Sequence, residues 1–190
     1  MVLIGQTSYV ANFSAWGQQL KNDVIMVVNT NTDVMTDTIK VGIEPNSMVA
    51  DKDDNIWILC SGGWSNNEFP TLWKINGSNG EVIHTYTFEV LESSPIGLKM
   101  NGEGDQLYFL NNGVFNMSIS EDELPSTPLI SQDNNKFFGY LGIDPSNGDI
   151  YIGDPKDYIS TGKVYRHSID GSLINEMEAG ISPGAFGFNY

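Results

Sequence analysis

Short apolar runs separated by clusters of Asn, Asp, Gly and Ser recur along the whole chain. The unit that begins at Pro45 shows the pattern in full, with four apolar segments and a polar or glycine-containing turn between them. Its segments are 46–50, 55–60, about 71–76 and 81–88. Runs of this length bounded by turn residues are typical of successive β-hairpins, and no stretch of the chain has helical periodicity. The pattern predicts an all-β protein.

The same unit is repeated at nearly even spacing. Four segments carry an aromatic residue within an apolar run, and successive aromatics lie 48, 51 and 43 positions apart. The segments are Tyr9-Val10-Ala11-Asn12, Ile56-Trp57-Ile58-Leu59, Leu107-Tyr108-Phe109-Leu110 and Ile150-Tyr151-Ile152-Gly153. Prolines 45, 95 and 183 follow a similar interval, with separations of 50 and then 88 residues. This interval matches one four-stranded blade of a β-propeller.

We therefore predict a single partial β-propeller domain over residues 1–190, with about four antiparallel four-stranded blades. The chain is expected to begin on a second strand, Thr7 to Asn12, and to end on a first strand, Gly184 to Tyr190. Three blades are then complete and the fourth is shared between the termini, so that no strand edge stays open. The predicted blades are 1–44 with 183–190, 45–94, 95–137 and 138–182.

Charge narrows the choice of partners. The chain has 9 Lys and Arg against 24 Asp and Glu, which gives a formal net charge of −15. Such a charge repels phosphate backbones and anionic lipids, so nucleic acid is not expected as a partner.

The single cysteine, Cys60, follows the apolar run Trp57-Ile58-Leu59 and is predicted to be a small buried residue. The first residues have neither a basic segment nor an apolar run long enough for a signal peptide.

The repeat resembles a known family. Tyr9-Val10-Ala11-Asn12 resembles the repeated motif of YVTN-repeat, YncE-like β-propellers, and Ile39-x-Val41-Gly42-x-x-Pro45-Asn46 resembles the phrase that leads into each of their blades. The stretches 43–63 and 180–186 are similar to surface lipoproteins of gut bacteria of the vitamin-B12-capturing BtuG type. This resemblance implies a ring of about seven or eight blades, of which the chain matches the C-terminal half.

The resemblance also implies where such a protein works. Members of the family have a signal peptide and a lipobox cysteine, and they capture ligands at the outer membrane, so it implies the cell surface or periplasm and an outer-membrane transporter as partner. The chain itself shows no signal peptide and no lipobox. Four blades shaped for a larger ring would leave exposed edges, so we expect either an open arc or a homodimer formed through those edges.

Ligands of propellers usually bind to loops at one end of the blades. The three long loops of this chain each carry an aromatic residue seven positions after the aromatic of the preceding strand: Trp16, Trp64 and Tyr158. The polar residues Asn12, Asn66, Asn67, Glu68, Asp154 and Asp157 accompany them. Apolar rings with a few polar groups are typical of a site for a flat or sugar-like ligand. The alternative is that the aromatics cover the blade ends.

Other chemistry finds less support. Asp51-x-Asp53-x-Asn55 begins like a calcium loop, but Ile56 and Gly62 stand where that loop needs Gly and Glu, so we predict a structural acidic turn. Histidines 84 and 167 have no ligand spacing, and both are expected on solvated strands. No cofactor and no metal site are predicted.

The leading hypothesis is a non-enzymatic ligand-binding propeller of the cell envelope that captures a corrinoid such as cobalamin, or a glycan. A scaffold for protein contacts is the alternative. A metal-dependent, lactonase-like hydrolase is less favoured, because the predicted inner strands offer Ser47, Gly97, Leu141 and Phe186 where acidic ligands would be needed.

Overall fold

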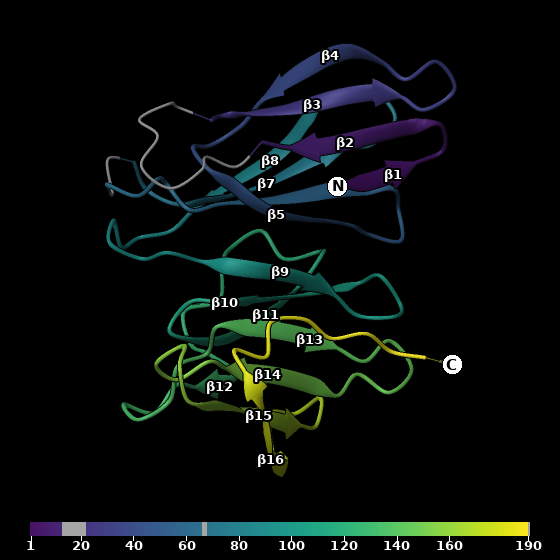
Figure 1. The fold of residues 1–190 in the computed structure, drawn as a ribbon. Coiled ribbons are helices and arrows are strands. Elements are labelled where there is room, and N and C mark those ends of the chain that lie inside the picture. The colour runs from purple at the N-terminus through teal and green to yellow at the C-terminus, as the bar shows by residue number, and fades with distance from the viewer. Residues whose placement is uncertain (13–21, 66–67, 190) are drawn as a thin grey trace. The chain divides into compact units, whose positions relative to one another are not determined.

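The computed structural model describes residues 1–12, 22–65 and 68–189. Within these residues the chain forms sixteen β-strands and no helix (Figure 1). The strands make four antiparallel sheets of four strands each, and each sheet takes four strands that are consecutive in the sequence. The prediction of an all-β protein built from four-stranded antiparallel blades is confirmed.

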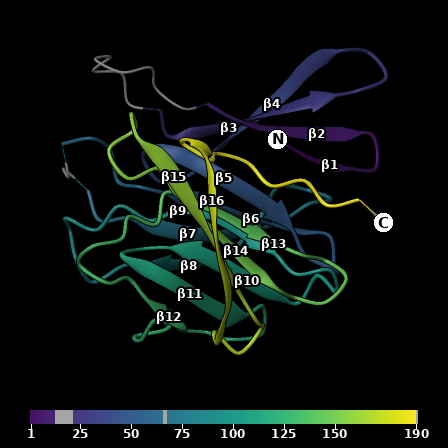
Figure 2. The same ribbon diagram turned by 60° about the horizontal axis from the view of Figure 1, so that its bottom comes forward.

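The four sheets follow one another along the chain. The first contains β1 (Val2–Ile4), β2 (Thr7–Ala11), β3 (Val24–Asn29) and β4 (Val34–Lys40). The second contains β5 (Pro45–Ala50), β6 (Asn55–Cys60), β7 (Thr71–Asn76) and β8 (Val82–Thr87), which Figure 2 shows side by side in that order. The third contains β9 (Ile96–Met100), β10 (Gln106–Leu110), β11 (Gly113–Ser118) and β12 (Ile130–Ser131). The fourth contains β13 (Tyr140–Ile143), β14 (Ile150–Asp154), β15 (Thr161–His167) and β16 (Leu173–Ile181).

Burial decreases from the second strand of a sheet to its last strand. In β6, Ile56 to Cys60 are completely buried, and Leu107 to Leu110 of β10 are nearly so. A continuous apolar run is what a strand needs when both of its faces are covered. By contrast, all but one residue of β16 are exposed. The aromatic-bearing runs of the sequence are therefore the buried second strands.

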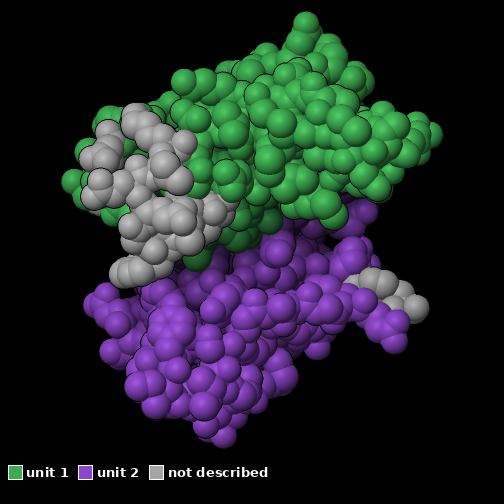
Figure 3. Space-filling model, turned by 45° about the horizontal axis from the view of Figure 1, so that its top comes forward, with its two compact units in different colours: residues 1–98, 122–124 green, residues 99–121, 125–190 purple. Residues whose placement is uncertain are grey.

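The chain divides into two compact units, shown in different colours in Figure 3. The first comprises residues 1–98 and 122–124, and the second comprises residues 99–121 and 125–190. In the first unit, Tyr9 and Ile25 of the first sheet pack with Ile56, Ile58 and Ile75 of the second sheet. The Tyr9 hydroxyl also donates a hydrogen bond of 2.8 Å to the carbonyl of Gly77. Neighbouring sheets are thus joined by apolar contacts and by buried polar contacts.

The chain does not begin on a second strand as predicted. Val2–Ile4 forms β1 and pairs with β2, with Val2 opposite Tyr9 and Ile4 opposite Thr7. Gly5, at φ 56°, provides the tight turn between the two strands. Residues 183–189 form no strand, so the first sheet takes its inner strand from Val2–Ile4 and not from the segment Gly184 to Tyr190. The short run Val2-Leu3-Ile4 suffices because Val2 and Ile4 pack against the core of the first unit.

The acidic turn at Asp51 is structural, as predicted. One carboxylate oxygen of Asp51 accepts hydrogen bonds from the backbone N–H groups of Asp53 and Asn55, each at 2.9 Å. The other accepts from the indole N–H of Trp57, also at 2.9 Å. In the third sheet Asn101 accepts from the N–H groups of Asp105 and Gln106 in the equivalent turn. These side chains stabilise the turns of the inner hairpins, which are the hairpins formed by the first two strands of a sheet: β5 with β6, and β9 with β10.

Cys60 is completely buried, as predicted, and burial raises its pKa to about 12.

The prediction that both histidines lie on solvated strands is confirmed for His84 only. His84 is exposed on β8, whereas His167 on β15 is buried and its Nδ1 lies 2.9 Å from the carbonyl oxygen of Gly171. His167 is covered because it faces the turn that joins β15 to β16.

Candidate functional site

The loop between β14 and β15 is held in shape by two carboxylates. Asp154, at the end of β14, accepts a hydrogen bond of 2.8 Å from the backbone N–H of Lys156. Asp157 accepts from the N–H groups of Ile159 and Ser160 and from the Ser160 hydroxyl. Such side-chain-to-backbone bonds replace the ladder bonds that a strand would make. The loop therefore has a defined conformation of its own.

This conformation places Tyr158 in the left-handed region, with φ 63°, two positions after Lys156, which is at φ 52°. For a bulky residue this conformation costs on the order of 1–3 kcal/mol, and such strain clusters at functional positions. The Tyr158 side chain is 55% exposed and that of Ile159 is 78% exposed. The loop thus displays two large apolar side chains at the surface.

Phe137, which precedes β13, completes an aromatic corner with Tyr158. The ring centroids are 6.2 Å apart and the ring planes are inclined by 59°. This is an ordinary geometry for an attractive aromatic pair. Phe137 is itself 44% exposed, so the pair stays open to solvent while each ring limits the movement of the other. We call Phe137, Tyr158 and Ile159 the aromatic corner.

Polar groups lie behind the loop. Asp154 is only 2% exposed, and its second oxygen accepts a hydrogen bond of 3.3 Å from the Tyr165 hydroxyl. The Lys136 ammonium lies 4.7 Å from the centre of the Tyr165 ring and 3.2 Å from a carboxylate oxygen of Asp133. Burial, followed by the charge of Asp154, raises the pKa of Tyr165 to about 12. Asp154 and Tyr165 therefore support the loop from within and do not reach the surface.

The carboxyl group of Asp157 is expected to titrate far below its ordinary range. Hydrogen bonds from the N–H groups of Ser160 and Ile159 and from the Ser160 hydroxyl lower its pKa to about 2. A depressed pKa means that these bonds stabilise the loop above the ordinary aspartate pKa and are lost only as the pH falls through about 2. A carbon-13 NMR titration of this carboxyl group should give that midpoint. A midpoint near 3.8, the ordinary pKa of an aspartate, would show that the loop is not held this way.

The structure describes only some of the predicted site residues. Asp157 and Tyr158 are exposed on one loop, whereas Asp154 shapes that loop from a buried position. Asn12 is exposed, and its amide donates a hydrogen bond of 3.2 Å to the side-chain oxygen of Asn22. Trp16, Asn66 and Asn67 lie outside the described residues.

Trp64 belongs to the first unit and is 61% exposed. It follows Gly62 and Gly63, whose φ angles of 80° and 92° favour glycine. A side chain on Gly62 would also meet the carbonyl oxygen of Glu68 at 2.2 Å, so the loop backbone packs closely here. Trp64 is thus displayed by a tight loop of its own, and we treat it separately from the aromatic corner in the second unit.

Sequence reasoning missed Phe137 and Lys136. They lie in the connection between the third and fourth sheets, outside the three long loops that carry the predicted site residues. A usable signal was present, because two aromatics stand side by side at Phe137-Phe138 just before a predicted strand. Phe138 is buried and packs against Tyr165 at 6.2 Å, which leaves Phe137 turned outward.

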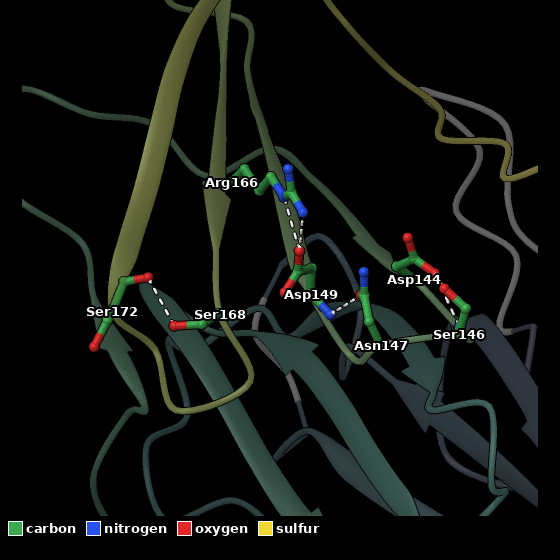
Figure 4. A network of polar contacts seen from close by, with 7 residues as sticks. All are labelled: Asp144, Ser146, Asn147, Asp149, Arg166, Ser168 and Ser172. Atoms are coloured by element: carbon green, nitrogen blue, oxygen red, sulfur yellow. Dashed lines mark hydrogen bonds and ion pairs between the residues drawn. The ribbon is translucent and has the colours of Figure 1, made fainter.

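The other end of the fourth sheet has a polar network, shown in Figure 4. Arg166 donates from Nε to a carboxylate oxygen of Asp149 at 2.7 Å, and its guanidinium lies 5.8 Å from the centre of the Tyr151 ring. Asp144 accepts from the N–H and hydroxyl groups of Ser146 in the same turn. These contacts are satisfied within the sheet, so the network has a structural role.

Two further findings concern the described residues alone. Among them no three His, Cys, Asp or Glu side chains are grouped so that they could hold a metal ion. They also contain no helix of the length and apolar character needed to cross a membrane.

Comparisons with known proteins support the fold. No protein-family model and no curated protein matches the chain. Among solved structures it is similar to a quinonprotein alcohol dehydrogenase-like protein from Bacteroides thetaiotaomicron, with a TM-score of 0.70 and 13% identity over 94% of this chain. It is similar to the hydrazine synthase of Kuenenia stuttgartiensis, with a TM-score of 0.68 and 13% identity over 93% of this chain. It is also similar to the propeller of Dos1, with a TM-score of 0.56 and 13% identity over 83% of this chain.

These similarities, together with the four four-stranded sheets, define the chain as having a β-propeller fold. The chain spans less than half of each similar protein, covering 45%, 47% and 43% of their lengths. The YVTN-repeat and BtuG-type resemblance is a finer assignment that these structures do not address.

The expectation that the protein is not an enzyme has to be corrected. Two of the similar structures are named as an alcohol dehydrogenase-like protein and as a hydrazine synthase. Propellers host unrelated activities, so the lack of acidic residues on the predicted inner strands is a weak reason to exclude catalysis. We therefore withdraw that expectation.

Proposed function

We propose that this propeller binds a small molecule with a flat or ring-shaped apolar face, such as a corrinoid or a glycan, at the aromatic corner. The observation that carries the proposal is the strained Tyr158, which is held at positive φ and exposed beside Phe137. A loop that only covered the blade end would bury this ring. The Tyr158 backbone instead has an unfavourable positive φ, and its ring remains exposed to solvent.

Residues beside the aromatic corner provide polar groups that can orient a ligand, in addition to the apolar contact area of the rings. Asp157 keeps its carboxylate charged at neutral pH, and it sits next to Tyr158 in the loop. Rings that provide apolar contact together with a few fixed polar groups are the usual composition of small-molecule sites. A place at the cell surface or in the periplasm and an outer-membrane transporter partner belong to the same proposal and rest on the family resemblance.

Calorimetric titration of the purified protein with cobalamin and with a panel of glycans tests the proposal. Tyr158→Ala is expected to weaken binding of the recognised ligand about tenfold, because truncating a central aromatic typically costs on the order of 1–2 kcal/mol. Ile169→Ala is the matched control, since Ile169 lies in the same unit, is 54% exposed and is outside the corner. Equal binding by the two variants would place the ligand elsewhere, and no heat with any ligand would refute the proposal.

A scaffold for protein contacts is the second candidate, and one observation favours it. Outer strands β4, β8 and β16 display large apolar side chains to solvent: Val34, Met35, Val82, Ile83, Leu173 and Ile174. Scattered exposed apolar residues are common, but each of these three outer strands carries two exposed apolar residues next to each other in the sequence. Co-purification of a protein partner that is lost in Leu173→Ser with Ile174→Ser, and retained in Tyr158→Ala, would support this function.

A further inference from the structure

Two hydroxyl groups lie close together at one end of the fourth sheet, the end that carries the aromatic corner. Tyr140 is the first residue of β13 and Ser182 directly follows β16, and their hydroxyl oxygens are 3.3 Å apart. Most hydrogen bonds between hydroxyl groups are shorter, with oxygens about 2.7–2.8 Å apart. Both residues are partly exposed. The two hydroxyls therefore satisfy each other only weakly, and other hydrogen-bonding groups can reach them.

Tyr140 adjoins the exposed rings of the aromatic corner. It lies opposite Gly153, near the end of β14, which leads into the loop that carries Tyr158. Phe137 is three positions before it, and a Cβ atom at the intervening Gly139 would lie 3.3 Å from the Phe137 ring. Burial raises the pKa of Tyr158, and the neighbouring Tyr140 phenol raises it further. The hydroxyl pair and the two exposed rings therefore belong to one surface of the second unit.

Close packing fixes the position of the Tyr140 ring. The backbones of Gly153 and Gly184 lie against it, because a Cβ atom at either position would already touch the ring, at 3.4 Å. A ring that is held before binding loses little freedom when its hydroxyl bonds to a ligand. The Tyr140 hydroxyl is thus preorganised.

Ser182 is positioned by the backbone on either side of it. It has a φ of 51° and makes the bend from β16 into the segment Pro183–Phe188. This segment lies beside β13 and is the yellow end of the chain in Figure 1. Its Phe186 side chain covers Gly142 and contacts the Tyr151 ring, with centroids 5.9 Å apart. The bend that carries the Ser182 hydroxyl is therefore anchored by packing.

The charges of the loop favour a ligand without formal charge. Its exposed part, residues 155–160, contains one charge of each sign, Lys156 and Asp157, although the whole chain has a net charge of −15. Net charge at this place therefore attracts neither an anion nor a cation. The Asp157 oxygens also accept hydrogen bonds from the N–H groups of Ile159 and Ser160, which takes part of the capacity that a cation would need.

A saccharide has both features that this surface offers to a ligand. The face of a sugar ring carries C–H groups that pack on aromatic rings, and its edge carries hydroxyls. Hydroxyls on neighbouring carbons lie about one hydrogen-bond length apart, which is close to the spacing of the Tyr140 and Ser182 hydroxyls. The rings of Phe137 and Tyr158 are inclined by 59°, so one can lie under the sugar face while the other borders its edge. A corrin ring carries amide side chains in place of adjacent hydroxyls and would use only the aromatic rings.

We propose that the aromatic corner takes a neutral saccharide, and that the hydroxyl groups of Tyr140 and Ser182 recognise two adjacent hydroxyls of its sugar ring. This assignment rests on the proposed function, because it names the ligand class of the same site. Tyr140 and Ser182 then determine specificity, whereas Phe137 and Tyr158 provide contact area. Removal of a hydroxyl from the pair should change which sugars are preferred, while removal of a ring should weaken the binding of all of them.

NMR titration with the neutral methyl glycosides of glucose, galactose and mannose tests the assignment, followed by the monodeoxy analogues of the sugar that binds most tightly. The natural protein is expected to bind two analogues, which lack neighbouring hydroxyls, about two- to tenfold more weakly than the parent sugar, the usual effect of one lost hydrogen bond. Tyr140→Phe should weaken the parent by a similar factor and should no longer distinguish the parent from one of the two analogues. Ser182→Ala should lose the distinction for the other analogue.

Tyr151→Phe is the matched control for Tyr140→Phe. It removes a tyrosine hydroxyl from β14 in the same unit, on a ring that contacts Phe186 and Arg166, and should leave every affinity unchanged. Thermal unfolding of the same variants is measured alongside. If the contact between Tyr140 and Ser182 were only structural, Tyr140→Phe would unfold at a lower temperature but keep the preference for the parent sugar over both analogues. That result would overturn the assignment.

Titration of Tyr158→Ala distinguishes a failure of this assignment from a failure of the proposed function. Binding of cobalamin but of no saccharide, weakened in Tyr158→Ala, would overturn the saccharide assignment and leave the aromatic corner as a binding site. Saccharide binding that Tyr158→Ala does not weaken would overturn both, since the ligand would then lie elsewhere. The absence of binding by every sugar and by cobalamin would also overturn both.

Discussion

Trp57→Ala is expected to lower the free energy of unfolding by about 3–5 kcal/mol, the usual cost of removing a large buried aromatic side chain. Trp57 is completely buried and stacks on Tyr86 at 5.7 Å, and the Lys74 ammonium lies 4.9 Å from the centre of its ring. The substitution also removes the indole N–H that bonds to Asp51, leaving a carboxylate oxygen without that donor. Both losses fall on the inner hairpin of the second sheet.

Urea unfolding followed by circular dichroism measures this effect. Trp64→Ala is the matched control, because it removes the same side chain from an exposed loop of the same unit and should change stability by less than about 0.5 kcal/mol. A loss for Trp57→Ala no larger than that for Trp64→Ala would mean that the second sheet is not packed around this ring.

Gly142→Ala is expected to cost about 1–3 kcal/mol, the usual range for overpacking a filled site. The new methyl group would lie 2.7 Å from both Cβ and Cγ of Phe186, atoms too close to the backbone to move without the segment. Pro183–Phe188 would then be displaced from β13. Gly180→Ala should be nearly neutral, because nothing lies within 4 Å of a Cβ atom at that position.

A double-mutant cycle with Phe186→Ala identifies the cause. If the collision with the Phe186 ring is responsible, Gly142→Ala should cost clearly less in the Phe186→Ala background than in the natural chain. Equal costs in the two backgrounds would show that the segment does not rest on Gly142. Thermal unfolding of the four proteins at one concentration and one salt level is sufficient for the comparison.

The repeat made the fold predictable, while the ends of the chain were misjudged. The buried second strands were recognised because a strand covered on both faces needs an unbroken apolar run, as at Trp57 and Tyr108. The strand Val2–Ile4 was missed because three apolar residues carry no periodicity. The segment after Pro183 has the spacing of an inner strand but forms no strand in the described residues, because its contact with Tyr151 depends on packing that the spacing does not encode.

For the candidate site, the sequence predicted exposed residues within a single loop but not the contacts between different segments of the chain. The interval of seven residues after the strand aromatic led to Trp64 and Tyr158, and both are exposed. The burial of Asp154 was not foreseen, because it depends on Tyr165 in the neighbouring strand. Phe137 was not foreseen either, since the ring that it contacts is 21 positions away in the sequence.

The order of strands within the sheets has a kinetic consequence. Every sheet is made of consecutive strands, and its inner hairpin is closed by short-range bonds such as those of Asp51 and Asn101. Each sheet can therefore form from a local stretch of chain, with a small loss of loop entropy for each pairing. During synthesis the first sheet can be complete before the last is translated, so each later sheet can assemble on a neighbour that is already folded.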